Sequence, residues 1–124
     1  MTAITFTLPF PDKLLWPNGR TRSYMAKHRA VKSHRGWAKV AALAAKAPKA
    51  DPAGRVSVAI TVHPKTRNPI DADNAVASFK SYADGIADAL GVDDRLFDTP
   101  TITFAEPIKG GQMTVTLTYQ PKGD

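Results

Sequence analysis

In the stretch "RVSVAITV", residues 55–62, every second residue is valine or isoleucine. A period of two places these side chains on one face of an extended chain, which predicts a strand half-buried in a sheet. From about Asp73 to Leu90 the apolar residues recur at helical spacing instead, and Gly91 stands where a C-terminal helix glycine belongs. A strand followed by a helix is therefore predicted for the middle of the chain.

The same patterns extend the prediction outward in both directions. Residues 2–8, "TAITFTL", alternate as a strand does, and a helix is predicted over much of 23–47, stopped by Pro48. Residues 101–106 and 113–119 read as two further strands, joined through "PIKGGQ". The order β-α-β-α-β-β predicts an α+β fold, in which helices pack on a mixed sheet. A chain of 124 residues is expected to form a single domain over 1–124.

Composition excludes several classes of protein. The chain has no cysteine, so it can form neither disulfides nor thiolate metal sites. No apolar run approaches the roughly 20 residues that a membrane span needs. The first residues, "MTAITFTLPF", lack the basic segment and the long apolar stretch of a signal peptide. We therefore expect a cytoplasmic protein without a membrane partner.

The net charge of +6 is unevenly distributed along the chain. Residues 1–50 hold ten lysines and arginines and one acidic residue, whereas residues 51–124 hold seven and ten. A basic half followed by an acidic cluster predicts a polyanion-binding surface beside a carboxylate site. The alternative is a basic protein with a solvated helix, and composition alone leaves both open.

Two pairs of aspartates flank the predicted helix of residues 73–90. Asp71 and Asp73 lie at its start, and Asp93 and Asp94 lie just past its end. In an extended approach, residues two apart project from the same side, so the first pair would repel unless a cation with oxygen ligands bound between them. Carboxylates converging on Mg²⁺ are typical of metal-assisted phosphodiester hydrolysis.

Two other interpretations of these aspartates stay open. Asp73 and Asp93 can act as helix caps, each contributing about 1 kcal/mol. A helix over 73–90 is also about 26 Å long, so Asp94 reaches Asp71 only if the chain turns back along the helix or a second subunit supplies it. The chain lacks an EF-hand loop, a glycine-rich phosphate loop, a catalytic triad and the histidine spacing of a zinc site.

Lys80 follows Asp73 by seven residues, so on a helix the two lie within about 20° of the same face. A lysine there can stabilise charge that develops on a scissile phosphate. It can equally form a surface ion pair with Asp84 at i+4. The residues alone favour the surface pair.

A basic stripe is predicted along the first helix, opposite an apolar line. The stripe comprises Arg29, Lys32, Arg35, Lys39 and Lys46, and the apolar line comprises Trp37, Val40, Ala41 and Ala44. Further cations precede the helix, and Lys65 and Arg67 lie close to Asp71 in sequence. Such a row matches contacts to phosphates, and Tyr24 or Trp16 could stack on an unpaired base.

Several short motifs occur together in an order that resembles RusA-type crossover-junction endodeoxyribonucleases, which are Holliday-junction resolvases common in phages and prophages. They are "LPFP" after the first strand, "WPNGRTR" before the basic helix, "DADN", a helical lysine, "ALGVDD" and a "KGG" turn. The resemblance covers nearly the whole chain, and its most specific part is D-x-D-N, lysine and D-D in that order.

The resemblance implies a homodimer that cuts branched double-stranded DNA with Mg²⁺, for which Mn²⁺ is an expected substitute. It implies that Asp71, Asp73 and Asp94 are metal ligands, with Asp93 as a neighbour, and that Lys80 is the catalytic lysine. A lysine four residues after the second aspartate is common in the family. That position is Ala77 here, and Lys80 lies one turn later. The residues expected to position the DNA backbone are Asn18, Arg20, Arg22, Arg29, Lys65 and Arg67.

Three functional hypotheses follow. The first is a Mg²⁺-dependent, structure-selective DNA endonuclease of phage or prophage origin, acting in the bacterial cytoplasm. The second is a non-catalytic nucleic-acid-binding module whose aspartates cap helices. The third is a small structural phage protein, which would have no affinity for DNA at physiological salt.

Overall fold

A four-stranded sheet forms one layer of the protein. The computed structural model describes residues 2–12, 15, 24–66 and 72–122, with only the helical backbone described at 72 and 73. The strands are β1 (Thr2–Pro9), β2 (Arg55–His63), β3 (Thr101–Phe104) and β4 (Gln112–Gln120), in the spatial order β1-β4-β2-β3. Strand β4 is antiparallel to β1 and β2, and β3 is parallel to β2. The predicted mixed sheet is confirmed.

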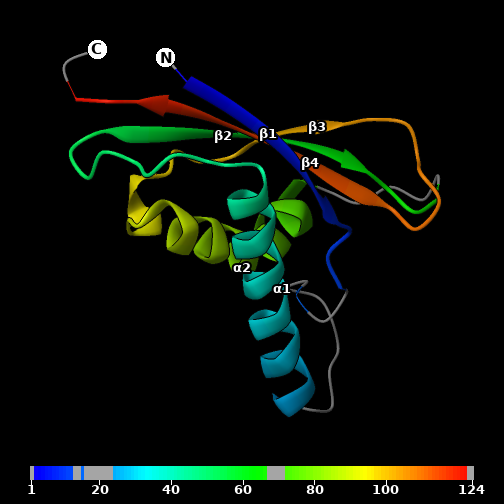
Figure 1. The fold of residues 1–124 in the computed structure, drawn as a ribbon. Helices are drawn as coiled ribbons and strands as arrows, with labels where there is room; N and C mark the ends of the chain where they lie inside the picture. The colour runs from blue at the N-terminus through cyan, green and yellow to red at the C-terminus, as the bar shows by residue number, and fades with distance from the viewer. Residues whose placement is uncertain (1, 13–14, 16–23, 67–71, 123–124) are drawn as a thin grey trace.

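Both helices lie on the same side of the sheet (Figure 1). They are α1 (Tyr24–Ala44) and α2 (Ala72–Leu90), so the predicted order β-α-β-α-β-β is confirmed. Helix α2 lies in the crossover that two parallel strands require, here β2 and β3. The last two strands are consecutive in sequence but are not neighbours, because β2 and β4 pair directly. A short 3₁₀ helix, η2 (Asp94–Leu96), lies between α2 and β3.

The core lies between the sheet and the two helices. Alternate residues of β2 and β4 point into it and are almost fully buried, as the period of two predicted. From α2 the core receives Phe79, Tyr82, Ile86 and Leu90, each at most 1 % exposed. The other face of the sheet carries small side chains, for example the cross-strand pair Thr5 and Thr116, whose hydroxyls lie 3.0 Å apart.

Helix α1 ends at Ala44, three residues before the predicted boundary. Lys46 adopts a left-handed conformation, with φ of 60°. The amide of Ala47 donates to the carbonyl of Ala42 over 3.0 Å, and the amide of Lys46 donates to Leu43 over 3.0 Å. These two bonds form a Schellman motif, so backbone hydrogen bonding ends the helix before Pro48 is reached. Helix α2 ends as predicted, with Gly91 at φ 72°.

The apolar line of α1 that lies opposite the basic stripe is not the face that the protein buries. The residues that α1 buries are His34, Ala38 and Ala42, whereas Trp37 and Val40 are 47 % and 66 % exposed. A Cβ placed on Gly85 of α2 would come within 2.0 Å of the carbonyl oxygen of Arg35 on α1. The two helix backbones therefore cross too closely for large side chains, and the alanine face rather than the tryptophan face is buried.

Candidate functional site

The structure describes only part of the predicted site. Asn18, Arg20, Arg22, Arg67 and Asp71 lie outside the described residues. For Asp73 only the backbone is described, as the second residue of α2. Lys80, Asp94, Arg29 and Lys65 are described with their side chains.

Lys80 and Asp94 meet although fourteen residues separate them in sequence. Beyond Gly91 the chain turns back, and the amide of Val92 donates to the carbonyl of Ala87 over 3.2 Å. This reversal brings Asp94 beside the middle of α2, where the ammonium of Lys80 donates to its carboxylate. The same ammonium lies 3.1 Å from Oδ1 of Asp84, so the surface pair expected from the sequence is confirmed and is joined by a second carboxylate.

The charges in this cluster stabilise one another. The hydrogen bond from Lys80 holds the pKa of Asp94 below its usual range, against a smaller opposing effect of burial. The hydrogen bond to Asp94 in turn raises the pKa of Lys80. The side chains remain accessible, since Lys80 is 63 % exposed and Asp94 is 29 % exposed. One ammonium is therefore held between two carboxylates at the surface of α2.

Of the two acidic residues interpreted as caps, only Asp93 has a described side chain. Asp93 is the N-cap of η2, and its carboxylate accepts a hydrogen bond of 2.9 Å from the amide of Arg95, so the capping interpretation is confirmed. Helix α2 already begins at Ala72, so Asp73 lies in the first turn. The side chain of Asp73 lies outside the described residues, so its role as a cap stays a prediction. An acidic residue in the first turn of a helix interacts favourably with the helix dipole.

A polar hollow of about 370 Å³ opens on one side of this cluster. It is lined by Arg35, Asp84, Ala87, Asp88, Val92, Asp93 and Asp94. Arg35 makes a two-pronged ion pair with Asp88, with N–O distances of 2.7 and 2.8 Å, and so joins α1 to α2. The sequence pattern placed Arg35 among the phosphate-binding cations, but the structure pairs it within the protein. No local signal marked this pair, because 53 residues separate its members.

A second hollow, of about 270 Å³, lies on the other side of Lys80 and is mainly apolar. Its walls come from α2, from β2 and from the segment that follows η2, and they include Phe79, Phe97 and Pro100. Lys80 and Asp94 line this hollow, and Asp94 also lines the polar one. Asp94 is therefore shared by a polar and an apolar recess.

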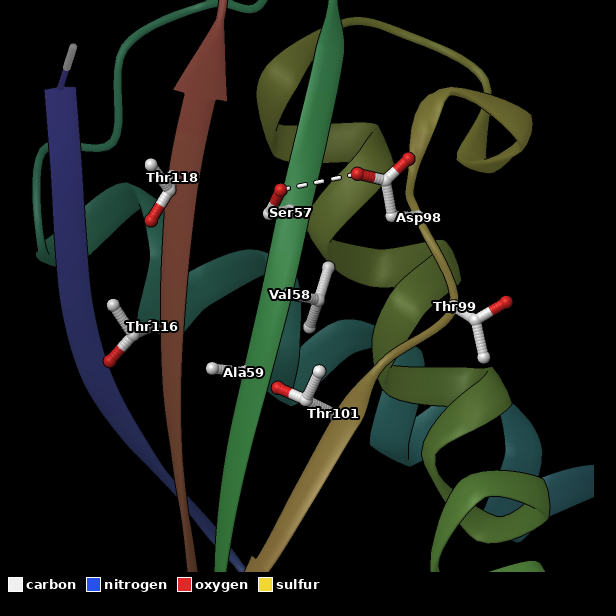
Figure 2. Close-up of a pocket in the computed structure, with 8 residues that line it drawn as sticks. All are labelled: Ser57, Val58, Ala59, Asp98, Thr99, Thr101, Thr116 and Thr118. Atoms are coloured by element: carbon white, nitrogen blue, oxygen red, sulfur yellow. Dashed lines mark hydrogen bonds between the residues drawn. The ribbon is translucent and has the colours of Figure 1, made fainter.

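A third hollow lies on the helix-free face of the sheet (Figure 2). Its only ionisable side chain is that of Asp98, which accepts a hydrogen bond from Ser57 over 3.1 Å. The same carboxylate is bound by Arg55, at 2.8 Å and 3.1 Å. Residues of β2, threonines of β3 and β4, and Thr99 form the remaining walls. The one carboxylate of this hollow is therefore already bound by Arg55 and Ser57.

The carboxylates around Lys80 are the type of ligand that a hard cation prefers, but too few of them converge among the described residues. Mg²⁺ prefers carboxylate oxygens, and Asp84 and Asp94 supply them. Among the residues that the structure describes, however, no three histidine or acidic side chains converge closely enough to hold a metal. A complete metal site would therefore need Asp71 and Asp73, whose side chains are not among those described.

The exposed cations of α1 form the second part of the candidate site. Arg29, Lys32 and Lys39 are exposed along the helix, and its N-terminal half extends away from the sheet (Figure 1). Tyr24 is 80 % exposed and stacks on His28, with ring centroids 6.3 Å apart. Lys65, also exposed, lies over the ring of Phe10, 5.8 Å from its centroid. The exposed side of α1 is therefore positive and carries an accessible ring at Tyr24.

The fold and this cluster define an α+β protein with an exposed lysine–carboxylate centre on its second helix. No family model matches the chain. It is 41 % identical over 116 residues to an uncharacterized protein of Xylella fastidiosa (strain Temecula1), and the match covers 92 % of this chain and 75 % of that protein. The chain belongs to the same family as that protein. Within the described residues, no helix is long and apolar enough to cross a membrane.

Proposed function

We propose that this chain is a Mg²⁺-dependent, structure-selective endonuclease that resolves Holliday junctions or related branched DNA by phosphodiester hydrolysis. The observation that carries the proposal is the meeting of Lys80 with Asp94 on the exposed side of α2. These residues belong to two separate motifs of the RusA-type pattern, and a chain reversal after Gly91 unites them. The exposed cations of α1 support a surface that holds the DNA backbone.

The geometry of α2 supports a site shared between two subunits. Lys80 follows Asp73 by about 10 Å along the helix axis, and Asp84 follows it by about 16 Å. Because the ammonium that binds Asp94 lies next to Asp84, Asp94 is held on the side of Lys80 away from Asp73. Ligands of one Mg²⁺ lie about 2.1 Å from it, so they must approach one another closely. A homodimer in which one chain supplies Asp71 and Asp73 and the other Asp94 meets this requirement.

In this proposal each predicted site residue has a chemical task. Mg²⁺, when bound by these aspartates, lowers the pKa of a coordinated water and neutralises charge on the phosphate. Lys80 supplies a positive charge to a non-bridging phosphate oxygen as negative charge accumulates there. Arg29 and Lys65, with Asn18, Arg20, Arg22 and Arg67, position the strands by contacts with phosphates, which carry little sequence information. The proposal implies a protein of the bacterial cytoplasm, with a phage or prophage origin.

Cleavage of a synthetic four-way junction tests this function directly. The wild-type chain is expected to cut the junction in Mg²⁺ or Mn²⁺ and to leave it intact in EDTA. Asp73→Asn is expected to abolish cleavage while retaining junction binding, because it removes a metal ligand and one negative charge. Asp51→Asn, the same charge change in the loop between α1 and β2, serves as the matched control. Full cleavage by Asp73→Asn would refute the metal role.

A second candidate function is a non-catalytic nucleic-acid-binding module. The confirmed cap at Asp93 favours it, as does the pairing of Lys80 with Asp84, because both give the charged residues structural tasks. This candidate predicts junction binding that weakens steeply with salt and no cleavage in any divalent metal. Binding and cleavage measured on the same junction separate the two functions.

A further inference from the structure

Lys80 differs from the other cations that form described ion pairs in the number of its partners. Arg35 and Arg55 each bind a single carboxylate, that of Asp88 and that of Asp98. The ammonium of Lys80 binds two carboxylates, one from its own helix and one from the turn that follows it. Two single negative charges around one accessible positive charge leave this cluster with a net charge of −1.

The type of cation in this cluster also matters. A guanidinium binds a carboxylate in a fixed, planar, two-pronged arrangement, whereas an ammonium acts as a compact point charge on a flexible stem. Lys80 is 63 % exposed, so its head can leave the carboxylates without opening the core. A divalent cation would neutralise Asp94 more completely than the ammonium does. The contact between Lys80 and Asp94 is therefore one that a metal ion can replace.

We propose that Lys80 is the resident counter-ion of Asp94, and that a divalent cation displaces it and so releases the ammonium toward a DNA phosphate. The inference rests on the proposed function and deepens it, since it assigns Lys80 a task before the substrate binds. In the metal-free protein the ammonium of Lys80 neutralises the carboxylate of Asp94, so its positive charge cannot interact with the substrate. With the metal bound, the same charge becomes available to the substrate.

Two consequences can be measured without following cleavage. Lysine and metal compete for Asp94, so removing the lysine must strengthen metal binding. Metal binding and phosphate binding must also assist each other, and such coupling is reciprocal, typically amounting to about 5- to 150-fold in affinity. A simple surface ion pair predicts neither effect, because an exposed pair contributes little free energy and has no second state.

The first arm of the test is a titration of the full chain with Mn²⁺. Electron paramagnetic resonance detects the Mn²⁺ that stays free in solution, and so gives the dissociation constant. Lys80→Met is expected to bind Mn²⁺ at least about fivefold more tightly than wild type, and Lys80→Arg is expected to bind close to wild type. Lys32→Met removes the same charge from exposed α1 and controls for long-range electrostatics. Equal or weaker binding by Lys80→Met, or equal tightening by Lys32→Met, would overturn the inference.

The second arm measures junction affinity with and without Ca²⁺, a hard cation that we expect to bind without supporting cleavage. The ratio of the two dissociation constants is the readout, so any general loss of DNA affinity cancels. Ca²⁺ is expected to tighten junction binding by wild type and by Lys32→Met but to leave binding by Lys80→Met unchanged. An unchanged ratio in wild type, or a wild-type ratio in Lys80→Met, would contradict the inference.

The outcomes also separate this inference from the proposed function. If wild type and Lys80→Met bind Mn²⁺ equally while Asp73→Asn abolishes cleavage, Lys80 is not a counter-ion but the nuclease function stands. If neither wild type nor Lys80→Met binds Mn²⁺, both the inference and the metal role in the proposed function fail.

Discussion

The two helices have similar lengths but different relations to the core. Helix α2 contributes Phe79, Tyr82 and Ile86 to the centre of the protein and presents the Lys80 cluster on its exposed side. Helix α1 buries only His34, Ala38 and Ala42, and its N-terminal half extends from the body (Figure 1). The difference separates two tasks: α2 joins the candidate chemistry to the most buried part of the fold, and α1 presents charge at a distance from it.

The largest expected effect is a loss of stability on truncating a buried side chain of α2, compared with an exposed side chain of α1. Phe79 is 1 % exposed, so Phe79→Ala leaves a cavity in the core and is expected to destabilise the fold by about 3–5 kcal/mol. Val40 on α1 is 66 % exposed, and Val40→Ala is expected to change stability by no more than about 0.5 kcal/mol. Chemical denaturation of both variants measures the contrast. Comparable losses would mean that α1 is packed as tightly as α2.

A pair of glycine substitutions sharpens the same contrast. A Cβ on Gly85 of α2 would meet backbone atoms of Arg35, so Gly85→Ala is expected to force the helices apart and to cost about 1–3 kcal/mol. A Cβ on Gly36 of α1 meets nothing within 4 Å, and Gly36→Ala is expected to stabilise by up to about 1 kcal/mol. The sign of the change in free energy of unfolding is the readout. Stabilisation by Gly85→Ala would contradict the close crossing.

The smallest expected effect concerns the one histidine that α1 buries. The imidazole of His34 donates from Nδ1 to the carbonyl of Ala30 over 2.7 Å, and Nε2 accepts from the amide of Asp12 over 3.1 Å. Burial against Trp37 and Tyr82 lowers the pKa of His34, and this effect exceeds the opposing influence of the Ala30 hydrogen bond and of the Asp12 charge. The neutral ring therefore suits the fold, because a proton on Nε2 would face another donor.

The sign of the pH effect follows from that lowered pKa. Below the ordinary histidine value of 6.5 the unfolded chain binds a proton that the native state resists. The contribution of His34 to stability is therefore full above this pH and declines as the pH falls through the native pKa. Denaturation between pH 8 and pH 5 should show a steeper loss in wild type than in His34→Gln, which does not titrate. Parallel curves would assign the pH dependence to other groups.

Local patterns predicted the elements well, because each is specified by neighbours in sequence. The period of two in residues 55–62 and the glycine at position 91 are both found as expected. The predicted end of α1 was late, since the left-handed conformation of Lys46 is one that glycine usually supplies. The predicted start of the second helix, about Asp73, lies one residue after the observed start at Ala72.

The candidate site was predicted less completely, for reasons that lie outside any local window. The pair of Lys80 with Asp84 follows from helical spacing alone. The contact of Lys80 with Asp94 depends on the direction in which the chain leaves α2, which spacing does not specify. The removal of Arg35 from the basic stripe depends on Asp88, 53 residues away. The roles of Asp71, Asp73 and the cations before α1 stay predictions.

The sequence by itself determined the strands, the helices, the basic first half and the acidic residues at both ends of α2, because periodicity and charge are properties of the unfolded chain as well. Only the tertiary structure decided which face of α1 is buried and that Asp94 joins Asp84 at Lys80. Those choices depend on how closely two backbones can approach and on where the chain reverses. Both are set by contacts between residues far apart in sequence.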